Sequence, residues 1–160
     1  MGLRRIHTTD EPALHKVCKP VTSFDWRLRK LLDDMRETLI DSNGVGLAAP
    51  QVGILKRVVL VDTGDEILEL INPEMLETSG EQTGSEGCLS VPGKAGNVTR
   101  PNYVKAMAYD ENMEPFEIEG TELLARAICH ELDHLDGHLY VEKVEGGLHD
   151  VTYEVEEDEE

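Results

Sequence analysis

The strongest hydrophobic periodicity in the N-terminal part of the chain has the spacing of an α-helix. Its apolar positions recur every three or four residues, at Leu28, Leu31, Leu32, Met35 and Leu39. Thr22 and Asp25 resemble a capping box ahead of this stripe, and Asn43-Gly44 supplies a stop after it. The pattern predicts a helix over residues 23–42 that packs on a sheet through a single apolar face.

From residue 57 onward the pattern changes to short runs of β-branched residues, which are typical of strands. The predicted strands are residues 57–62, 67–71, 86–91 and 104–109. Turn signals stand at residues 63–65 and 110–112. The segments that connect the predicted strands are mostly too short for a parallel crossover, which needs a dozen or more residues. The pattern therefore favours antiparallel pairing.

A second helix is predicted from Glu122 to Asp136, with Thr121 as its N-cap and Gly137 as its stop. Its first half is mostly apolar, which indicates a buried helix. Strands framed by two separate helices predict an α+β fold, with antiparallel β-sheets packed around this second helix in a single compact domain. We assign residues 1–149 to that domain. Residues 150–160 are predicted to form a frayed acidic tail, because their like charges repel one another.

The net charge of −18 narrows the range of partners. The last ten residues hold six acids and no Lys or Arg, so the rest of the chain carries −12. Such a field repels phosphate backbones and anionic lipid, which argues against tight binding to nucleic acid or to a membrane. The longest uncharged stretch, residues 42–55, is too short and too broken to span a bilayer. Because no signal-peptide pattern is present, we expect a cytoplasmic protein, and we expect it to be a monomer.

Residues 130–134, His-Glu-Leu-Asp-His, place two imidazoles four positions apart in the second predicted helix. That spacing puts His130 and His134 on one helical face, close enough to hold one metal ion. The carboxylate of Glu131 can accept a proton from activated water and return it to a leaving group. The alternative is an accidental pattern of surface histidines, which the apolar residues ahead of the motif disfavour.

A catalytic metal site needs a third protein ligand, and the sequence offers four positions for it. Tyr140 stands where a metzincin would have its third histidine, which weakens that interpretation. Glu154 follows His134 by twenty residues, as in thermolysin-like sites, but it belongs to the acidic tail. His138 comes after the predicted helix stop at Gly137, which should turn its side chain away.

Cys88 is the remaining candidate, in the segment Glu-Gly-Cys-Leu-Ser at residues 86–90. A thiolate with two imidazoles is a good ligand set for a divalent metal, and zinc is the ion that this chemistry alone would favour. From spacing alone, the alternative of a small buried core residue stays open. Cys129 lies about 100° round the helix from His130, so we interpret it, like Cys18, as core filling.

Three ordered segments resemble the signature motifs of the peptide deformylase family. They are Gly-Val-Gly-Leu-Ala-Ala-Pro-Gln at residues 44–51, Glu-Gly-Cys-Leu-Ser at 86–90 and His-Glu-Leu-Asp-His at 130–134. The resemblance implies a metal-dependent hydrolase that removes the formyl group from the N-terminal formyl-methionine of newly synthesised polypeptides and releases formate. It also implies a compact α+β fold, in agreement with the pattern of elements.

The same resemblance implies roles for individual residues. The metal ligands would be Cys88, His130 and His134. The family typically holds Fe(2+), which Ni(2+), Co(2+) or Zn(2+) can replace, so iron is expected from the resemblance and not from the ligand chemistry. Glu131 corresponds to the catalytic acid/base, while the Gln51 side chain and the Leu89 backbone N–H resemble the donors that stabilise an oxyanion.

An apolar pocket for the methionine side chain is expected beside the metal. Gly44 and Gly46 would let a loop backbone pass close to an extended peptide. The other expected substrate-binding residues are Val45, Gly87, Leu123, Arg126 and Ala127. Core packing explains the three apolar positions, Val45, Leu123 and Ala127, almost as well. Glu86 and Arg100 are predicted to form an ion pair that holds the strand of Cys88.

The expected partners are N-formyl-methionyl nascent chains, with transient proximity to the ribosome but no tight attachment through the acidic tail. Two other interpretations stay open. The first is another metal-dependent amidase or peptidase, which a preference for formyl-Met over acetylated peptides would exclude. The second is a non-catalytic metal- or peptide-binding module, which would need neither Glu131 nor Gln51.

Overall fold

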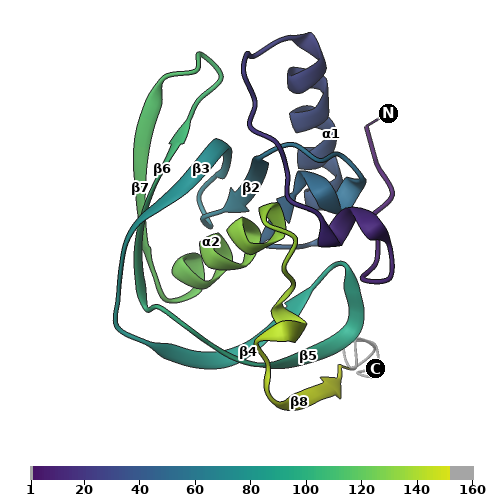
Figure 1. Cartoon of the computed structure of the whole chain (residues 1–160), viewed down its shortest axis with the longest axis vertical. Helices are drawn as coiled ribbons and strands as arrows, with labels where there is room; N and C mark the ends of the chain where they lie inside the picture. The colour runs from purple at the N-terminus through teal and green to yellow at the C-terminus, as the bar shows by residue number, and fades with distance from the viewer. Residues whose placement is uncertain (1, 152–160) are drawn as a thin grey trace.

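Helix α2 (Glu122–Leu135) lies between two antiparallel sheets in the computed structural model, which describes residues 2–151 (Figure 1). One sheet has the strand order β1-β2-β3-β6-β7 and the other the order β4-β5-β8. The strands are β1 (Gly46–Ala48), β2 (Val58–Asp62), β3 (Ile67–Ser79), β4 (Gln82–Cys88), β5 (Val91–Arg100), β6 (Tyr103–Tyr109), β7 (Pro115–Thr121) and β8 (Glu145–Asp150). The predicted α+β class and antiparallel pairing are therefore confirmed.

Strand β2 lies between two hydrophobic clusters, because side chains on both of its faces are buried. Val59 and Val61 contribute to the cluster under α2, whereas Val58 and Leu60 contribute to the cluster under helix α1 (Trp26–Ser42). Successive side chains of a strand point to opposite faces of the sheet, so one short strand joins the two clusters. The predicted packing of the first helix on a sheet is confirmed.

Helix α1 begins three residues later than the prediction of 23–42. The Asp25 side chain accepts a hydrogen bond of 3.0 Å from the Leu28 backbone N–H, so Asp25 itself is the N-cap. At the other end Asn43 adopts a left-handed conformation with φ 58°, which ends the helix where the stop signal predicted. The predicted capping box is therefore wrong, because Asp25 and not Thr22 caps the helix, and the helix starts one turn later than expected.

The strand predicted over residues 86–91 is wrong. Residues 86–88 end β4 and Val91 begins β5, and Leu89 and Ser90 form the turn between them. Cys88 pairs with Val91 directly across this turn, with a register shift between Glu86 and Cys88. The chain reverses inside the predicted segment, which places Cys88 at a strand end beside the turn.

The other three strand predictions are confirmed in place, and those over 57–62 and 104–109 differ from β2 and β6 by one residue at the start. The strand predicted over 67–71 continues to Ser79, and the pairing with β6 contains bulges. Strands β1, β7 and β8 were not predicted, nor was β5 beyond Val91, because β1 is three residues long and the others have mixed composition. Three short 3₁₀ helices, η1 (Pro12–His15), η2 (Ala49–Val52) and η3 (Tyr140–Glu142), complete the described chain.

The C-terminal end of the predicted domain lies in β8, whose last residue is Asp150. The greater part of the predicted tail, residues 152–160, lies outside the described residues. Between residues 2 and 151, no helix has the length and apolar character needed to cross a membrane.

Candidate metal centre and substrate pocket

The Cys88 thiol and two imidazoles of α2 converge in the space between β4 and α2. The Nε2 atoms of His130 and His134 lie 3.2 Å apart, and Cys88 Sγ lies 3.4 Å from His134 Nε2. Ligands about 2.0–2.3 Å from a tetrahedral ion stand about 3.3–3.6 Å from one another, so these distances fit a shared metal. The three residues form a metal-binding cluster with one ligand atom from each.

Helix α2 brings the two histidines together because residues four apart stand one turn above each other. Cys88 reaches them from the end of β4, where the turn into β5 directs its side chain towards the helix. The donor set of one thiol and two imidazoles suits a divalent transition metal. A fourth coordination position would remain for a water or a substrate atom, which is the arrangement of a catalytic site.

The other candidates for the third ligand lie elsewhere. His138 is exposed, and its Nδ1 lies 3.0 Å from a Glu142 carboxylate oxygen. Tyr140 is buried and donates its hydroxyl proton to the Lys94 carbonyl oxygen at 3.2 Å. Glu154 is outside the described residues. Cys88 is therefore the candidate that the structure places with both histidines.

The Glu86 carboxylate holds His130 in position. Its Oε1 atom lies 3.2 Å from His130 Nδ1, which leaves the Nε2 atom of that ring directed at the cluster. Carboxylates that hold the second nitrogen of a ligating histidine are common around protein metals. Sequence reasoning missed this contact, although Glu86 stands two positions before Cys88, on the same face of the strand.

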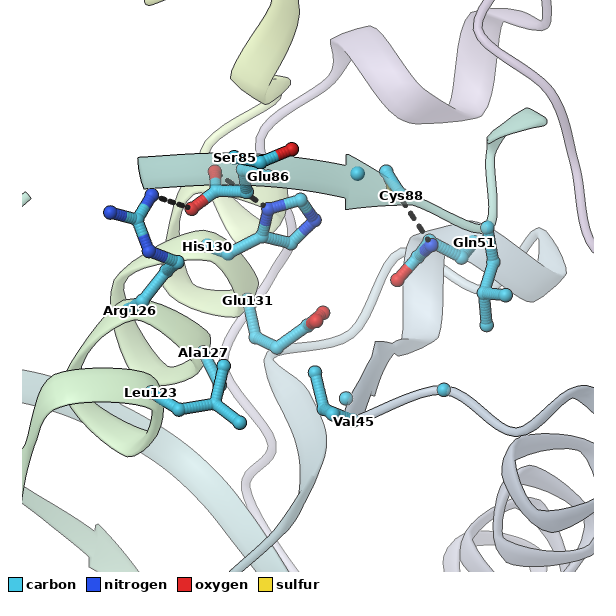
Figure 2. Close-up of a pocket in the computed structure, with 14 residues that line it drawn as sticks. Val45, Gln51, Ser85, Glu86, Cys88, Leu123, Arg126, Ala127, His130 and Glu131 are labelled. Carbon is cyan, nitrogen blue, oxygen red and sulfur yellow. Dashed lines mark hydrogen bonds and ion pairs between the residues drawn. The ribbon is translucent and has the colours of Figure 1, made fainter. Parts of the chain in front are cut away.

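Two buried guanidinium groups balance the charge of Glu86. Arg100 donates to its carboxylate at 2.6 and 3.3 Å. Arg126 Nη1 donates to it at 3.0 Å, as Figure 2 shows. The predicted pair between Glu86 and Arg100 is therefore confirmed. Burial by itself raises the pKa of Glu86, but the hydrogen bonds from His130 and Arg100 outweigh burial and lower that pKa to about 2.

Glu131 points into the pocket beside the metal cluster (Figure 2). Its side chain is buried, and its Oε1 atom has no hydrogen-bond partner among the described residues. Burial raises the pKa of this carboxyl to about 7. A carboxyl group with that pKa exchanges protons readily near neutral pH, as a general acid/base must.

The Gln51 amide makes contacts with both of its ends. Its Oε1 accepts a hydrogen bond from the Ala48 backbone N–H at 2.9 Å. Its Nε2 donates to Ser90 Oγ at 3.1 Å and approaches Cys88 Sγ at 3.5 Å. Sequence reasoning missed Ser90, which belongs to the same motif as Cys88. These contacts hold the amide N–H₂ group next to the metal cluster.

A pocket of about 120 Å³ opens beside these groups. All the residues expected to bind substrate line it, together with Gln51, Cys88, Leu89, His130 and Glu131. Ser85 and Glu86 line it as well and were not expected to do so. Figure 2 shows Leu123 and Ala127 on the α2 side and Val45 on the opposite side. Leu123 and Val45 are 63% and 45% exposed, so both stand at the rim and neither is a core residue.

The two glycines of the first motif lie in close contact with side chains of the protein itself. A Cβ atom on Gly46 would lie 2.5 Å from Glu131 Oε2, and one on Gly44 would lie 2.9 Å from a Leu89 methyl group. Gly46 therefore leaves room for the Glu131 carboxylate, and Gly44 leaves room for Leu89. Both glycines also line the pocket, so their predicted place beside an extended peptide stays a prediction.

The other two cysteines are core residues, as expected. Cys18 and Cys129 are 3% and 8% exposed. Burial raises the pKa of each thiol to about 11, which keeps both protonated and inert at neutral pH.

Comparison with known proteins agrees with this geometry. The sequence profile of the polypeptide deformylase family matches residues 3–148. The chain belongs to this family. Polypeptide deformylases are amide hydrolases that remove N-terminal formyl groups from polypeptides, and the family is metal-dependent.

Individual deformylases are similar over nearly their whole length. A peptide deformylase of Agathobacter rectalis is 66% identical over 96% of this chain and 98% of its own. The peptide deformylase structure from Thermotoga maritima superposes with a TM-score of 0.88 and 38% identity, over 91% of this chain and 99% of that one. A peptide deformylase from Synechococcus elongatus, solved in complex with actinonin, has a TM-score of 0.87 and 39% identity, with coverage of 91% and 81%.

Proposed function

We propose that this deformylase binds one Fe(2+) ion through Cys88, His130 and His134 and hydrolyses the formyl group of N-formyl-methionyl nascent chains. When bound, a divalent ion there would acidify water and polarise the formyl oxygen. Ni(2+), Co(2+) or Zn(2+) could replace iron, because the same thiol and imidazole donors accept all of them. The distances within the cluster support a single ion.

Glu131 carries the protons in this proposal. Its carboxylate accepts a proton as water attacks the formyl carbon, and it returns that proton to the amide nitrogen as the carbon–nitrogen bond breaks. The products are formate and a free α-amino group. The observation that carries the assignment is a buried carboxylate with a free oxygen and a pKa of about 7 next to the metal cluster.

Gln51 and Leu89 act on the oxygen that becomes negatively charged during the attack. The Gln51 Nε2 group and the Leu89 backbone N–H donate hydrogen bonds to that oxygen. Such donors lower the barrier most when they are held in place before the reaction. The contacts of Gln51 with Ala48 and Ser90 support this role, because they restrain the amide from both ends.

The methionine side chain occupies the pocket between α2 and the glycine loop. Val45, Leu123 and Ala127 supply apolar surface there, and Gly44, Gly46 and Gly87 supply open backbone. Arg126 contributes its aliphatic stem, since its guanidinium group is paired with Glu86. We further propose that the protein is a cytoplasmic monomer that meets nascent chains near the ribosome without binding nucleic acid tightly. In this proposal residues 1–149 form the catalytic domain and residues 150–160 an acidic tail.

Formate release from formyl-Met-Ala-Ser by the nickel-loaded protein tests the proposal. We expect rapid release by the wild type, no acetate from acetyl-Met-Ala-Ser, and a loss of about a hundredfold or more in Glu131→Gln at full metal content. Glu119→Gln is the matched control, because Glu119 is exposed on β7 and should leave the rate unchanged. Near wild-type turnover by Glu131→Gln with one metal per chain would overturn the assignment of the acid/base.

A further inference from the structure

Val45 stands where three hollows of the surface meet. It lines the pocket beside the metal cluster, a second hollow of about 210 Å³ and a third of about 280 Å³. The second hollow lies between Leu123 and the turn after β2, and the third lies against Ile40 near the end of α1. We call the second and third hollows together the outer trough.

The rim at Val45 and Leu123 offers a polypeptide substrate a route out of the inner pocket. The pocket beside the metal has a volume of only about 120 Å³, which leaves the residues after the first one outside it. Val45 and Leu123 are the exposed apolar side chains at the rim, and both also line the outer trough. Residues that follow formyl-methionine therefore pass within reach of the trough.

Asp62 is the one ionisable side chain that lines the outer trough in the described part of the chain, and it borders both hollows. It is exposed at the end of β2, and its backbone N–H donates to the Val45 carbonyl oxygen at 2.8 Å. Its Oδ1 accepts a hydrogen bond from the Gly64 backbone N–H, which orients the carboxylate. Between residues 2 and 151, no Lys, Arg or His forms an ion pair with it.

Within residues 2–151, Arg126 is the one Lys or Arg that lines the inner pocket or the outer trough. The guanidinium group of Arg126 lines the inner pocket, but it is paired with the buried Glu86 carboxylate. The protein as a whole carries a strong negative charge. A substrate side chain in the trough therefore meets a negative field whose nearest fixed source is Asp62.

We propose that Asp62 is a specificity-determining residue that favours formylated chains with Lys or Arg in the first residues after methionine and disfavours chains with Asp or Glu there. The proposal rests on the proposed function, since it assigns the path of the same substrate. An exposed ion pair of this kind changes kcat/KM by about two- to fivefold, and salt weakens it.

The test compares kcat/KM for formyl-Met-Lys-Ala and formyl-Met-Ala-Lys with their glutamate counterparts, at low and high ionic strength. We expect the wild-type enzyme to prefer lysine about fivefold or more at low salt at one or both positions, and to lose most of that preference at high salt. Asp62→Asn should reduce the preference at least about threefold, because the amide keeps the hydrogen bond to Gly64 but removes the charge.

Asp65→Asn is the matched control. Asp65 is exposed in the same turn but lines neither hollow, and the substitution changes the net charge by the same amount. Asp65→Asn should leave the ratio of kcat/KM for the lysine peptides to kcat/KM for the glutamate peptides close to the wild-type ratio. Equal effects of the two variants, or a wild-type enzyme without a charge preference, would overturn the proposal. Failure of the neutral peptide formyl-Met-Ala-Ser to react would instead overturn the proposed function.

Discussion

Gly46 carries no side chain because the Glu131 carboxylate occupies the space in which one would stand. The position lies in β1, three residues before η2 begins, and its φ angle is not left-handed. The glycine is therefore required by a contact between two segments and not by a turn. A methyl group there would have to displace the carboxylate or bend the strand.

Gly46→Ala tests this reading at the scale of a single residue. We expect kcat to fall at least about tenfold, because a displacement of about 1 Å at a reacting group can cost a hundredfold in rate. Metal content should stay at one ion per chain. Formate release and metal analysis on the same preparation are the measurements.

Gly84→Ala is the control for this change. A Cβ atom on Gly84 would lie 3.4 Å from Arg126 Nη2, at the end of a flexible side chain, and Gly84 also has an ordinary backbone conformation. We expect this variant to keep kcat within about threefold of the wild type. Full activity of Gly46→Ala would show that Glu131 can move aside without consequence for the reaction.

At the scale of elements, Glu86 joins β4, β5 and α2. Its carboxylate contacts Arg100 of β5 and both Arg126 and His130 of α2. Arg100 in turn donates to Asp133 of α2 at 2.8 Å. The smaller sheet is therefore tied to the metal-binding helix by a buried network of charges that also orients a metal ligand.

Arg100→Leu is predicted to lower the free energy of unfolding by about 3 kcal/mol, because the buried Glu86 carboxylate loses two charge-assisted hydrogen bonds and keeps Arg126 as its one guanidinium partner. The Arg100 and Glu86 side chains are only 5% and 4% exposed, so solvent cannot replace the lost partner. Urea denaturation of the metal-loaded protein measures the change.

Lys105→Leu provides the comparison, since Lys105 pairs with Glu117 at 3.5 Å on the surface of β6 and β7. Exposed pairs contribute about 1 kcal/mol or less, so this variant should be nearly as stable as the wild type. An equal loss of unfolding free energy in the two variants would contradict the prediction that the buried network stabilises the fold more than a surface pair does.

At the scale of the whole molecule, the metal ligands connect parts of the core that are otherwise separate. The two histidines belong to α2, which covers the main hydrophobic cluster, whereas Cys88 packs against a third cluster formed by residues such as Leu14, Val98 and Tyr140. An ion shared by these ligands would hold the smaller sheet against the helix. Metal binding therefore contributes to the stability of the fold as well as to chemistry.

Removal of the metal by a chelator is predicted to lower Tm by about 5 °C or more. An ion present at a hundred times its Kd stabilises the native state by about 2.7 kcal/mol, and each kcal/mol shifts Tm by about 2–4 °C in a domain of this size. Calorimetry with and without chelator measures the shift. Cys129→Ala should retain it and Cys88→Ala should lose it, and a shift that survives in Cys88→Ala would argue against the thiol as a ligand.

The sequence by itself determined the features that depend on local geometry. The stripe of α1, the stop at Asn43 and the four-residue spacing of the α2 histidines follow from the period of a helix, which needs no knowledge of the rest of the chain. The three motifs also identified the family, because their residues and order are specific even when their positions in space are unknown.

Only the tertiary structure decided which distant segments meet. The spacing of the residues left the place of Cys88 open, and only the family resemblance put it with the histidines. The turn inside the predicted strand at 86–91 and the contact of the Glu131 carboxylate with Gly46 came from the structure alone. Strand partners and close approaches of this kind depend on the packing of the whole chain. The local residue pattern does not specify which distant segment packs against a given residue. Contacts between distant segments therefore could not be predicted from the pattern alone.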